Sequence, residues 1–462
     1  MPAALRATIV LAILGQVFVV LGVAGALTPI WTAAAFAAAL FAAAPAAARA
    51  AAGRAATCVA AVQIVLLILL ALYPPVAFDE TLYHLPFIRA IARTGAIAFH
   101  PDIRFGIFPQ LHEVLCVPAF LAFGDVATHF VALIELLLLA GIVWKWGGPL
   151  AAALVVGNPI VFHLATITYD EMALALFVTA GFFCLDREKP AAAGLLFAAA
   201  CSVKYLGWYF AVAALIVALY RRRPIFLATF IAGILPMYAT IFAYRGFENL
   251  SQWTTHRVVV PWRVLWDITF ARDRVNQQPP YSPLFAISML IVFFRSRWLA
   301  ILCLGYLACF AFLPQDSRYL LPLLPLVSVA VAKMEFPWKN AIAIASIAIG
   351  IAYAGYRIAR WGFPPLSAEA RREFQRQHIP ELRALGARGP GRIWVCGAEQ
   401  LKYFGGDDLY GDVTGPWSPE RVNLRTFDYV LVSRRQCPSM QNLPFEVVYA
   451  DAGATLWRVA PR

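Results

Sequence analysis

Charged residues are scarce in this 462-residue sequence, in which Asp, Glu, Lys and Arg together supply only 14% of the positions. A soluble domain typically carries about 25% charged residues. Hydrophobic residues make up 61% of the chain, and its mean hydropathy is +0.70. Runs such as 7–27 and 57–74 are long enough to cross a hydrocarbon core about 30 Å thick. The composition therefore excludes a soluble protein and predicts an α-helical polytopic membrane protein.

Several motifs of soluble enzymes are also missing. The sequence contains no GxxxxGK[ST] loop, no GxGxxG turn, no HExxH and no GxSxG. ATP-driven transport and zinc proteolysis therefore have no support. The formal net charge of +12 does not indicate nucleic acid, because basic residues collect in the short cytoplasmic loops of membrane proteins.

The apolar runs predict about thirteen transmembrane helices. The candidate spans lie near 7–27, 29–47, 57–74, 126–145, 148–165, 172–186, 190–203, 205–220, 225–244, 282–294, 298–313, 319–333 and 340–358. With Arg6 in the cytoplasm, every compact basic cluster falls on the cytoplasmic side, as the positive-inside rule requires. This assignment needs 111–124 to be a surface or re-entrant helix. It also needs a break at 202–207, which leaves Lys204 near the outer surface.

The last hundred residues differ in character from the rest. A charged helical stretch is followed by strand-like runs at 392–397, 429–435 and 445–459, the last of which turns at Ala452-Gly453. We therefore expect a transmembrane domain over 1–360, with an outer loop at 75–125 that carries interfacial helices. A small α/β domain over 361–462 is expected on the outer face.

Two of the eight cysteines, Cys396 and Cys437, lie in this polar C-terminal region, and each follows a predicted strand. Neighbouring parallel strands could bring them together, and on an oxidising outer face they could form a disulfide. The alternative is two unpaired thiols.

The first polar cluster, FDETLYHLP, directly follows an apolar run and contains Asp79, Glu80, Tyr83 and His84. We expect irregular backbone over 79–85, because the proline that follows suits only the first turn of a helix. Two carboxylates would then sit at the mouth of the bilayer. In the simpler alternative, Asp79 caps a helix and Glu80 is solvated.

A short helix is expected directly after this cluster, from Pro86 to a stop at Gly95. Its apolar residues can face lipid, and Arg89 and Arg93 share a polar side because they are four residues apart. A helix of this kind lies in the membrane interface, with its basic groups at the level of headgroup phosphates.

Two further clusters are predicted on the same side of the membrane. Asp170 and Glu171 open a span, where acidic residues also favour the helix dipole without any other role. Arg318 and Tyr319 enter a proline-punctuated span, QDSRYLLPLLPL. A guanidinium binds phosphate well, although Arg318 could also simply snorkel to the surface. Lys204 is the second candidate for binding phosphate.

Together these motifs resemble the GT-C superfamily of membrane glycosyltransferases, and most closely its bacterial members related to protein mannosyltransferases and the aminoarabinose transferase. The likeness covers 57–360 and rests on the acidic first outer loop followed by YHLP, on YDE, and on RYLLPLLPL. It implies an inverting transferase that uses a polyprenyl-phosphate-linked sugar. The acceptor would be an envelope lipid, glycan or protein, and the active site would face the periplasm from the bacterial inner membrane.

The resemblance also assigns roles to residues. Asp79 corresponds to the general base, Glu80 is its neighbour, and Asp170 or Glu171 corresponds to the second acidic site. Donor phosphate would be held by basic residues near the outer face, for which the candidates are Lys204, Arg318, Arg89 and Arg93. Tyr83, His84 and Tyr319 are further site candidates. Some members use a divalent metal such as Mg or Mn, but this sequence has no DxD motif, so no metal is assigned.

Other functions remain open at this point. A glycan ligase or polymerase would use a polyprenyl-diphosphate donor, and the loop 245–281 could supply the extra cations that such a donor needs. A transporter could line its pathway with Asp79 and Lys204, although transporters usually place charges near mid-membrane and show repeated halves. A non-catalytic envelope-assembly protein could keep the same fold.

Overall fold

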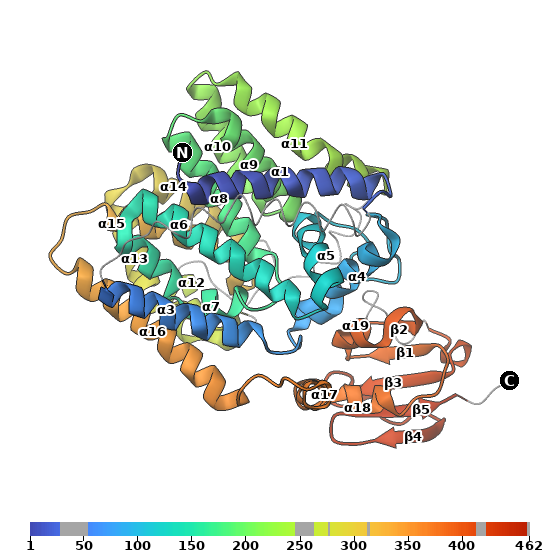
Figure 1. Ribbon diagram of the computed structural model, residues 1–462. Helices are drawn as coiled ribbons and strands as arrows, with labels where there is room; N and C mark the ends of the chain where they lie inside the picture. Colours follow the sequence, from blue (N-terminus) through green and yellow to red (C-terminus); the bar gives the residue numbers. More distant parts are fainter. Residues whose placement is uncertain (28–53, 245–262, 276–277, 312–314, 413–421, 460–462) are drawn as a thin grey trace.

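A computed structural model describes residues 1–27, 54–244, 263–275, 278–311, 315–412 and 422–459. Most of the chain forms a helical part, and a small sheet follows it at the C-terminal end (Figure 1). The predicted span at 29–47 and most of the loop 245–281 lie outside the described residues.

Four of the described helices are long and apolar enough to cross a membrane. They are α1 (Ala3–Val23), α6 (Ala127–Val156), α11 (Pro224–Ala243) and α16 (Lys339–Trp361). Shorter apolar helices pack around them: α3 (Arg54–Ala71), α5 (Leu111–Phe123), α9 (Pro190–Val203), α10 (Gly207–Tyr220), α13 (Pro283–Arg295), α14 (Arg297–Phe310) and α15 (Leu323–Ala332). The predicted α-helical class is therefore confirmed. These helices alone do not establish how many times the chain crosses the membrane, so the number of thirteen stays a prediction.

Two breaks in the helices follow from the sequence. The α6 helix bends at Gly148, whose φ of 79° is unfavourable for other residues, and Pro149 follows it. The predicted spans 126–145 and 148–165 thus belong to one bent helix, followed by the short α7 (Pro159–Leu164). The break predicted at 202–207 is confirmed, because α9 ends where Lys204 becomes extended.

The segment that carries the first polar cluster is more regular than predicted. Residues Glu80–His84 form a π-helix, η1, which continues into α4 (Leu85–Thr94). The expectation of irregular backbone was wrong, because all five side chains of η1 are buried and packing holds the turn. Such π-helical turns are rare in proteins, and those that occur are often found at functional sites. As predicted, α4 stops at Gly95, which has a φ of 68°.

The predicted environments of α4 and α5 need correction. Phe87, Ile88 and Ile91 of α4 are fully buried in the protein core instead of facing lipid. The α5 helix packs against α1, α4 and α6 and is buried from Leu111 to Ala119, and only its C-terminal end is exposed. It is therefore not a surface helix along most of its length, and the re-entrant alternative stays a prediction. Apolar side chains satisfy a lipid surface and a protein interior equally well, and the sequence pattern does not separate the two.

The C-terminal region is the predicted α/β unit. It begins with α17 (Ala368–His378) and α18 (Glu381–Gly386) and contains one sheet in the order β2-β1-β3-β5-β4. The strands are β1 (Ile393–Cys396), β2 (Leu409–Gly411), β3 (Tyr429–Ser433), β4 (Glu446–Ala450) and β5 (Ala454–Arg458). The β4–β5 hairpin turns where predicted. Strand β1 is parallel to β3. Cys396, the last residue of β1, and Cys437, which follows β3, form a disulfide.

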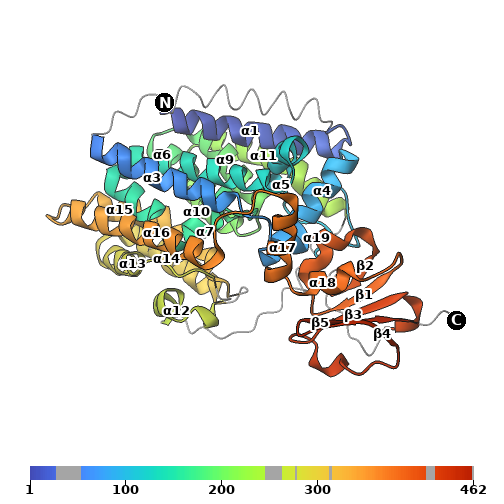
Figure 2. The same cartoon turned by 60° about the horizontal axis from the view of Figure 1, so that its bottom comes forward.

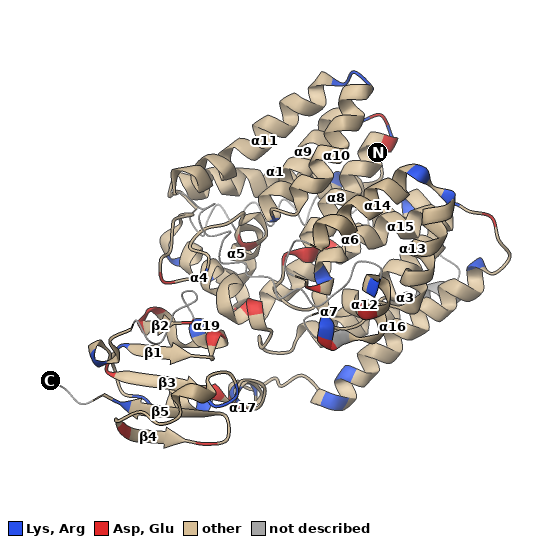
Figure 3. Cartoon of the chain, turned by 180° about the vertical axis from the view of Figure 1, so that it is seen from behind, with Lys and Arg blue, Asp and Glu red and all other residues tan. Residues whose placement is uncertain are grey.

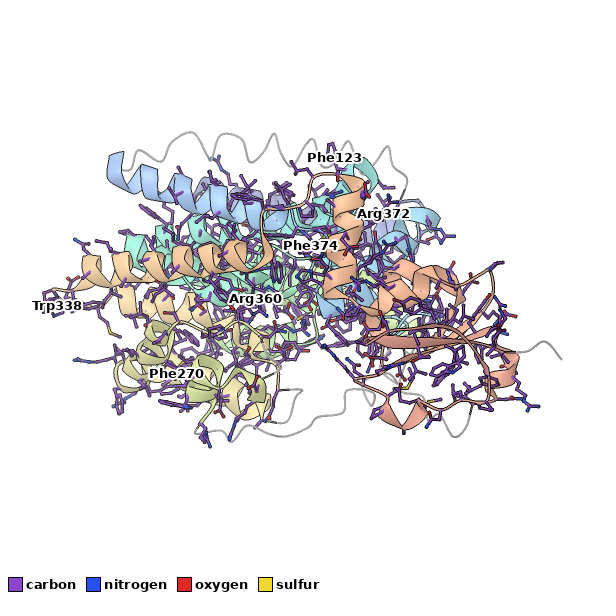
Figure 4. The ribbon with its side chains drawn as sticks, turned by 90° about the horizontal axis from the view of Figure 1, so that it is seen from below. Phe123, Phe270, Trp338, Arg360, Arg372 and Phe374 are labelled. Atoms are coloured by element: carbon purple, nitrogen blue, oxygen red, sulfur yellow. A yellow bond between two sulfur atoms is a disulfide. The ribbon has the colours of Figure 1, made fainter. Side chains whose placement is uncertain are left out.

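The C-terminal region docks onto the helical part through its helices, which lie between the sheet and the membrane helices (Figure 2). Phe374 of α17 stacks on Tyr73 at a ring distance of 5.4 Å and also contacts Trp361 at the end of α16. Figure 4 shows Phe374 on this inner side of α17, whereas Phe123, Phe270 and Trp338 lie at outer edges of the molecule, where they are exposed.

Three hydrogen bonds of this interface end on main-chain carbonyls. Gln375 Nε2 donates to Pro75 O over 3.5 Å, and Gln400 Nε2 donates to Val76 O over 3.0 Å. In the opposite direction, Arg89 of α4 donates from Nη1 to the carbonyl of Tyr403 over 2.6 Å. The interface therefore reaches the segment just before η1.

Candidate active site

Four segments that are distant in sequence meet inside the helical part. They are η1, the start of α8 (Glu171–Asp186), the break after α9, and the short helix η5 (Ser317–Leu320). Figure 3 shows acidic and basic segments gathered there within otherwise uncharged helices. Most of the residues that the sequence singled out lie in this cluster.

Arg318 lies at the centre of the cluster. Its guanidinium forms an ion pair with Asp79, and its Nε lies 2.8 Å from Asp316 Oδ2 and 3.3 Å from Glu171 Oε1. Its side chain is only 4% exposed, so the prediction that it might merely snorkel is wrong. Its Nη1 is buried and has no hydrogen-bond partner among the described residues. Arg318 therefore connects both sequence-predicted acidic clusters and retains one donor group.

Lys204 is the second cation. Its Nζ lies 2.6 Å from Asp170 Oδ1 and 2.7 Å from Glu171 Oε1, and 4.8 Å from the centre of the Tyr319 ring. Burial alone would lower the pKa of Lys204, but Asp170 and Glu171 outweigh it and raise this pKa. The lysine is thus buried inside the protein. Its expected depth near the outer face of the membrane stays a prediction.

Aromatic rings surround Arg318 and Asp79. The guanidinium lies 4.7 Å from the ring centre of Tyr169 and 5.2 Å from that of Tyr319. Tyr83 donates its hydroxyl to Asp79 Oδ2 over 3.1 Å, and Tyr169 accepts a hydrogen bond from the Asp79 amide over 3.0 Å. The Asp79 side chain is 15% exposed, more than that of Arg318. Asp79 is therefore the acid of this cluster that a substrate can reach.

Glu80 lies outside this cluster, although the sequence placed it beside Asp79 as a catalytic candidate. It is fully buried, and its Oε1 lies 2.7 Å from His129 Nε2 and accepts a hydrogen bond from the Thr168 amide over 2.8 Å. Burial would raise the pKa of Glu80, but His129 and the amide donors outweigh it and lower the pKa. Glu80 thus ties η1 to α6, and it is buried instead of solvated.

His84 likewise turns away from Asp79. Its Nδ1 lies 2.5 Å from Glu113 Oε1, and nearby His112 Nδ1 lies 3.0 Å from Glu135 Oε1. All four side chains are fully buried. Sequence reasoning assigned none of these partners. The adjacent His and Glu at the start of α5 were a signal, but each partner lies more than twenty residues away.

Arg89 and Arg93 are not part of the cluster around Arg318. Besides its bond to the Tyr403 carbonyl, Arg89 lies over the Tyr403 ring at 5.1 Å. Arg93 forms an exposed ion pair with Asp407 over 3.4 Å. Both arginines of α4 therefore contact the C-terminal region and lie outside the cluster around Arg318.

A metal-binding group can be sought among the described residues. There, Cys396, Asp412 and Cys437 are the three His, Cys, Asp or Glu residues with donor atoms close enough to share an ion. Because the two cysteines form a disulfide, their sulfurs are not thiolate ligands. This group does not fit a metal.

Two solved structures share this architecture. One is ArnT from Cupriavidus metallidurans bound to undecaprenyl phosphate, with a TM-score of 0.59 and 14% identity, covering 89% of this chain and 99% of that one. The other is its apo state, with a TM-score of 0.57 and 14% identity, covering 88% and 98%. This chain has the GT-C fold. No family model matches the sequence, and no curated protein matches it.

The GT-C likeness extends to the C-terminal region, because the alignment covers nearly all of ArnT and most of this chain. The resemblance inferred from the short motifs of 57–360 is thus confirmed at the level of the fold, and over a longer part of the chain than those motifs cover.

Proposed function

We propose that this chain is a membrane glycosyltransferase that transfers a sugar from a polyprenyl-phosphate donor to an acceptor in the cell envelope. The observation that carries the proposal is the position of Arg318, buried between Asp79 and Glu171 with one free donor group. The shared fold with an ArnT structure that holds undecaprenyl phosphate supports this donor class. The active site and the C-terminal region would face the periplasm.

In this proposal Asp79 is the general base. Its carboxylate accepts the proton of the acceptor hydroxyl as that oxygen attacks the anomeric carbon of the donor sugar. The new bond forms on the face opposite the phosphate, the bond from the anomeric carbon to the phosphate oxygen breaks, and the configuration inverts. Tyr83 and Arg318 hold the carboxylate in place.

Arg318 and Lys204 would stabilise the charge that develops on the leaving polyprenyl phosphate. Both are paired with carboxylates, so an arriving phosphate replaces some of these contacts and does not meet free cations. Asp170 and Glu171 keep Lys204 in place and charged. Because the cluster contains only these two cations among the described residues, we favour a monophosphate donor over a diphosphate.

Mass spectrometry of envelope lipids and glycans tests the proposal. Four strains are compared: wild type, a deletion, Asp79→Asn, and Asp407→Asn as a carboxylate control in the exposed pair with Arg93. We expect the deletion and Asp79→Asn strains to lack the same sugar, while Asp407→Asn retains it. A normal sugar content in Asp79→Asn, with the protein present in the membrane, would show that Asp79 is not the base.

A further inference from the structure

A second polar cluster lies beside the proposed active site, where the helical part meets the C-terminal region. Arg104, from the loop between α4 and α5, donates from Nη1 to Glu399 Oε2 over 2.6 Å. Glu399 opens η6 (Glu399–Leu401), which precedes α19 (Lys402–Gly405). The two side chains are 19% and 21% exposed, whereas Arg318 is 4% exposed. This ion pair can therefore be reached from outside.

The pair lies close to Asp79. The η6 segment packs directly on η1, and Gln400 is hydrogen-bonded to the carbonyl of Val76. Burial raises the pKa of Glu399, and the nearby carboxylates of Asp412 and Asp79 raise it further, against the effect of Arg104. Glu399 and Asp79 thus belong to segments that pack on one another, although they are more than three hundred residues apart.

Aromatic contacts connect the pair to the base. Arg104 lies over the Phe105 ring at 5.7 Å, and the edge of Phe105 meets Tyr83 at 5.3 Å. Tyr83 in turn donates to Asp79. The φ of Phe105 is 73°, a conformation that residues other than glycine rarely adopt. The surrounding contacts hold this backbone in place, so the positions of Arg104 and Phe105 are fixed.

We infer that Arg104, Glu399 and Asp412 bind the acceptor, and that the acceptor presents an uncharged saccharide to Asp79. Carboxylates accept hydrogen bonds from sugar hydroxyls, and a guanidinium donates to sugar oxygens. Arg104 Nε is buried and has no hydrogen-bond partner among the described residues, so one donor remains available.

The charge of the cluster distinguishes between acceptor classes. Two carboxylates face one guanidinium, and burial raises the pKa of Asp412 while Arg104 lowers it. The cluster therefore offers sugar hydroxyls several acceptor oxygens, whereas an anionic acceptor would find the Arg104 guanidinium already paired with Glu399. The inference rests on the proposed function, and it assigns donor binding to the helical part and acceptor binding largely to the C-terminal region.

Three full-length variants test the inference. Glu399→Gln removes the acidic group, Arg104→Glu with Glu399→Arg restores an ion pair in reverse, and Asp407→Asn is the matched control in the same interface. We measure the amount of transferred sugar in cells, and the binding of undecaprenyl phosphate to each purified protein. We expect Glu399→Gln and the reversed pair to lose product at least 10-fold and to bind the lipid phosphate like wild type, while the control changes neither.

The outcomes separate this inference from the proposed function. Recovery of product by the reversed pair would mean that the ion pair only holds the interface, which would overturn the inference. Equal product from Glu399→Gln and Asp407→Asn would also overturn it. A wild-type protein that binds no undecaprenyl phosphate, from a gene whose deletion changes no sugar, would overturn the proposed function itself.

The linkage in the product tests the acceptor class. Mild acid cleaves glycosyl phosphates far faster than glycosidic bonds. We expect the transferred sugar to remain attached after such treatment, because it is joined to a sugar hydroxyl. Release of the sugar would show a phosphate acceptor and would overturn the inference, even where Asp79→Asn abolishes transfer.

Discussion

The chain contains two adjacent Asp–Glu pairs in its helical part, and the two pairs differ in how their carboxylates are used. Asp170 and Glu171 both bind Lys204, so this pair acts as one unit. Asp79 and Glu80 separate, since Asp79 binds Arg318 and Glu80 binds His129. The same Asp–Glu dipeptide therefore forms different contacts in the two places.

The difference follows from local backbone and from the partners. Successive residues of a helical turn point about 100° apart, so Asp79 and Glu80 face different neighbours. Asp170 and Glu171 would also diverge, but the extended backbone at Lys204 brings one long side chain between them. The position of a cation, and not adjacency in sequence, decides whether two acids share a role.

The largest expected effect comes from removing the cation that links the two pairs. Arg318→Gln leaves Asp79, Glu171 and Asp316 without their shared partner, and it removes the proposed phosphate contact. We expect transfer to fall by about 10²–10³-fold, measured as transferred sugar per membrane-bound protein. Arg89→Gln is the control for losing a half-buried arginine contact outside the cluster. Comparable losses in both variants would show that Arg318 has only a structural role.

The next largest effect is expected when Asp79 and Glu80 are substituted one at a time. Glu80→Gln breaks the buried pair with His129, and breaking such a pair costs about 3–5 kcal/mol. We expect a clear drop in the thermal midpoint of the purified protein. Asp79→Asn, at the exposed end of its cluster, should change the midpoint much less while it abolishes transfer. Equal loss of stability in both variants would contradict the division of roles.

A smaller effect of the same pair should appear on acidification. The pKa of Glu80 lies below its ordinary value of 4.5 in the folded protein. Its ionised form therefore stabilises the fold above pH 4.5, and this contribution is lost as the pH falls below that value. The difference in thermal midpoint between wild type and Glu80→Gln should shrink between pH 6 and pH 4. A difference that grows on acidification would refute this assignment.

The smallest effect is expected at the exposed ion pair of the domain interface. Arg93 and Asp407 are 65% and 68% exposed, and such pairs contribute about 0–1 kcal/mol. Asp407→Asn should leave both the thermal midpoint and sugar transfer close to wild type. A large loss of either would mean that this interface depends on surface charge.

The sequence correctly predicted features of the fold that depend on neighbouring residues. Lys204 in an apolar run predicted the helix break, Gly95 predicted the end of α4, and Gly453 predicted the last hairpin. Asp79 follows from the polar cluster directly after an apolar run, and Arg318 and Lys204 follow from the affinity of cations for phosphate. All three lie in the same cluster.

Contacts between residues that are far apart in the sequence could not be predicted. Nothing near Glu80 in the sequence indicates His129, and nothing near Glu399 indicates Arg104. Phe87 shows a different reason, because an apolar side chain is equally stable against lipid or against protein. The sequence assigned Arg89 and Arg93 to a phosphate. A guanidinium binds carbonyls and carboxylates as readily as phosphate, and the sequence does not show which of these partners lies nearby.

The three hydrogen bonds that end on the carbonyls of Pro75, Val76 and Tyr403 have an evolutionary consequence. A carbonyl is present whichever residue occupies the position, so substitutions there leave the acceptor side of each bond unchanged. Related chains could diverge widely at these positions and still dock the C-terminal region in the same orientation. Such an attachment allows the loops of that region to change in sequence while the proposed active site in the helices stays as it is.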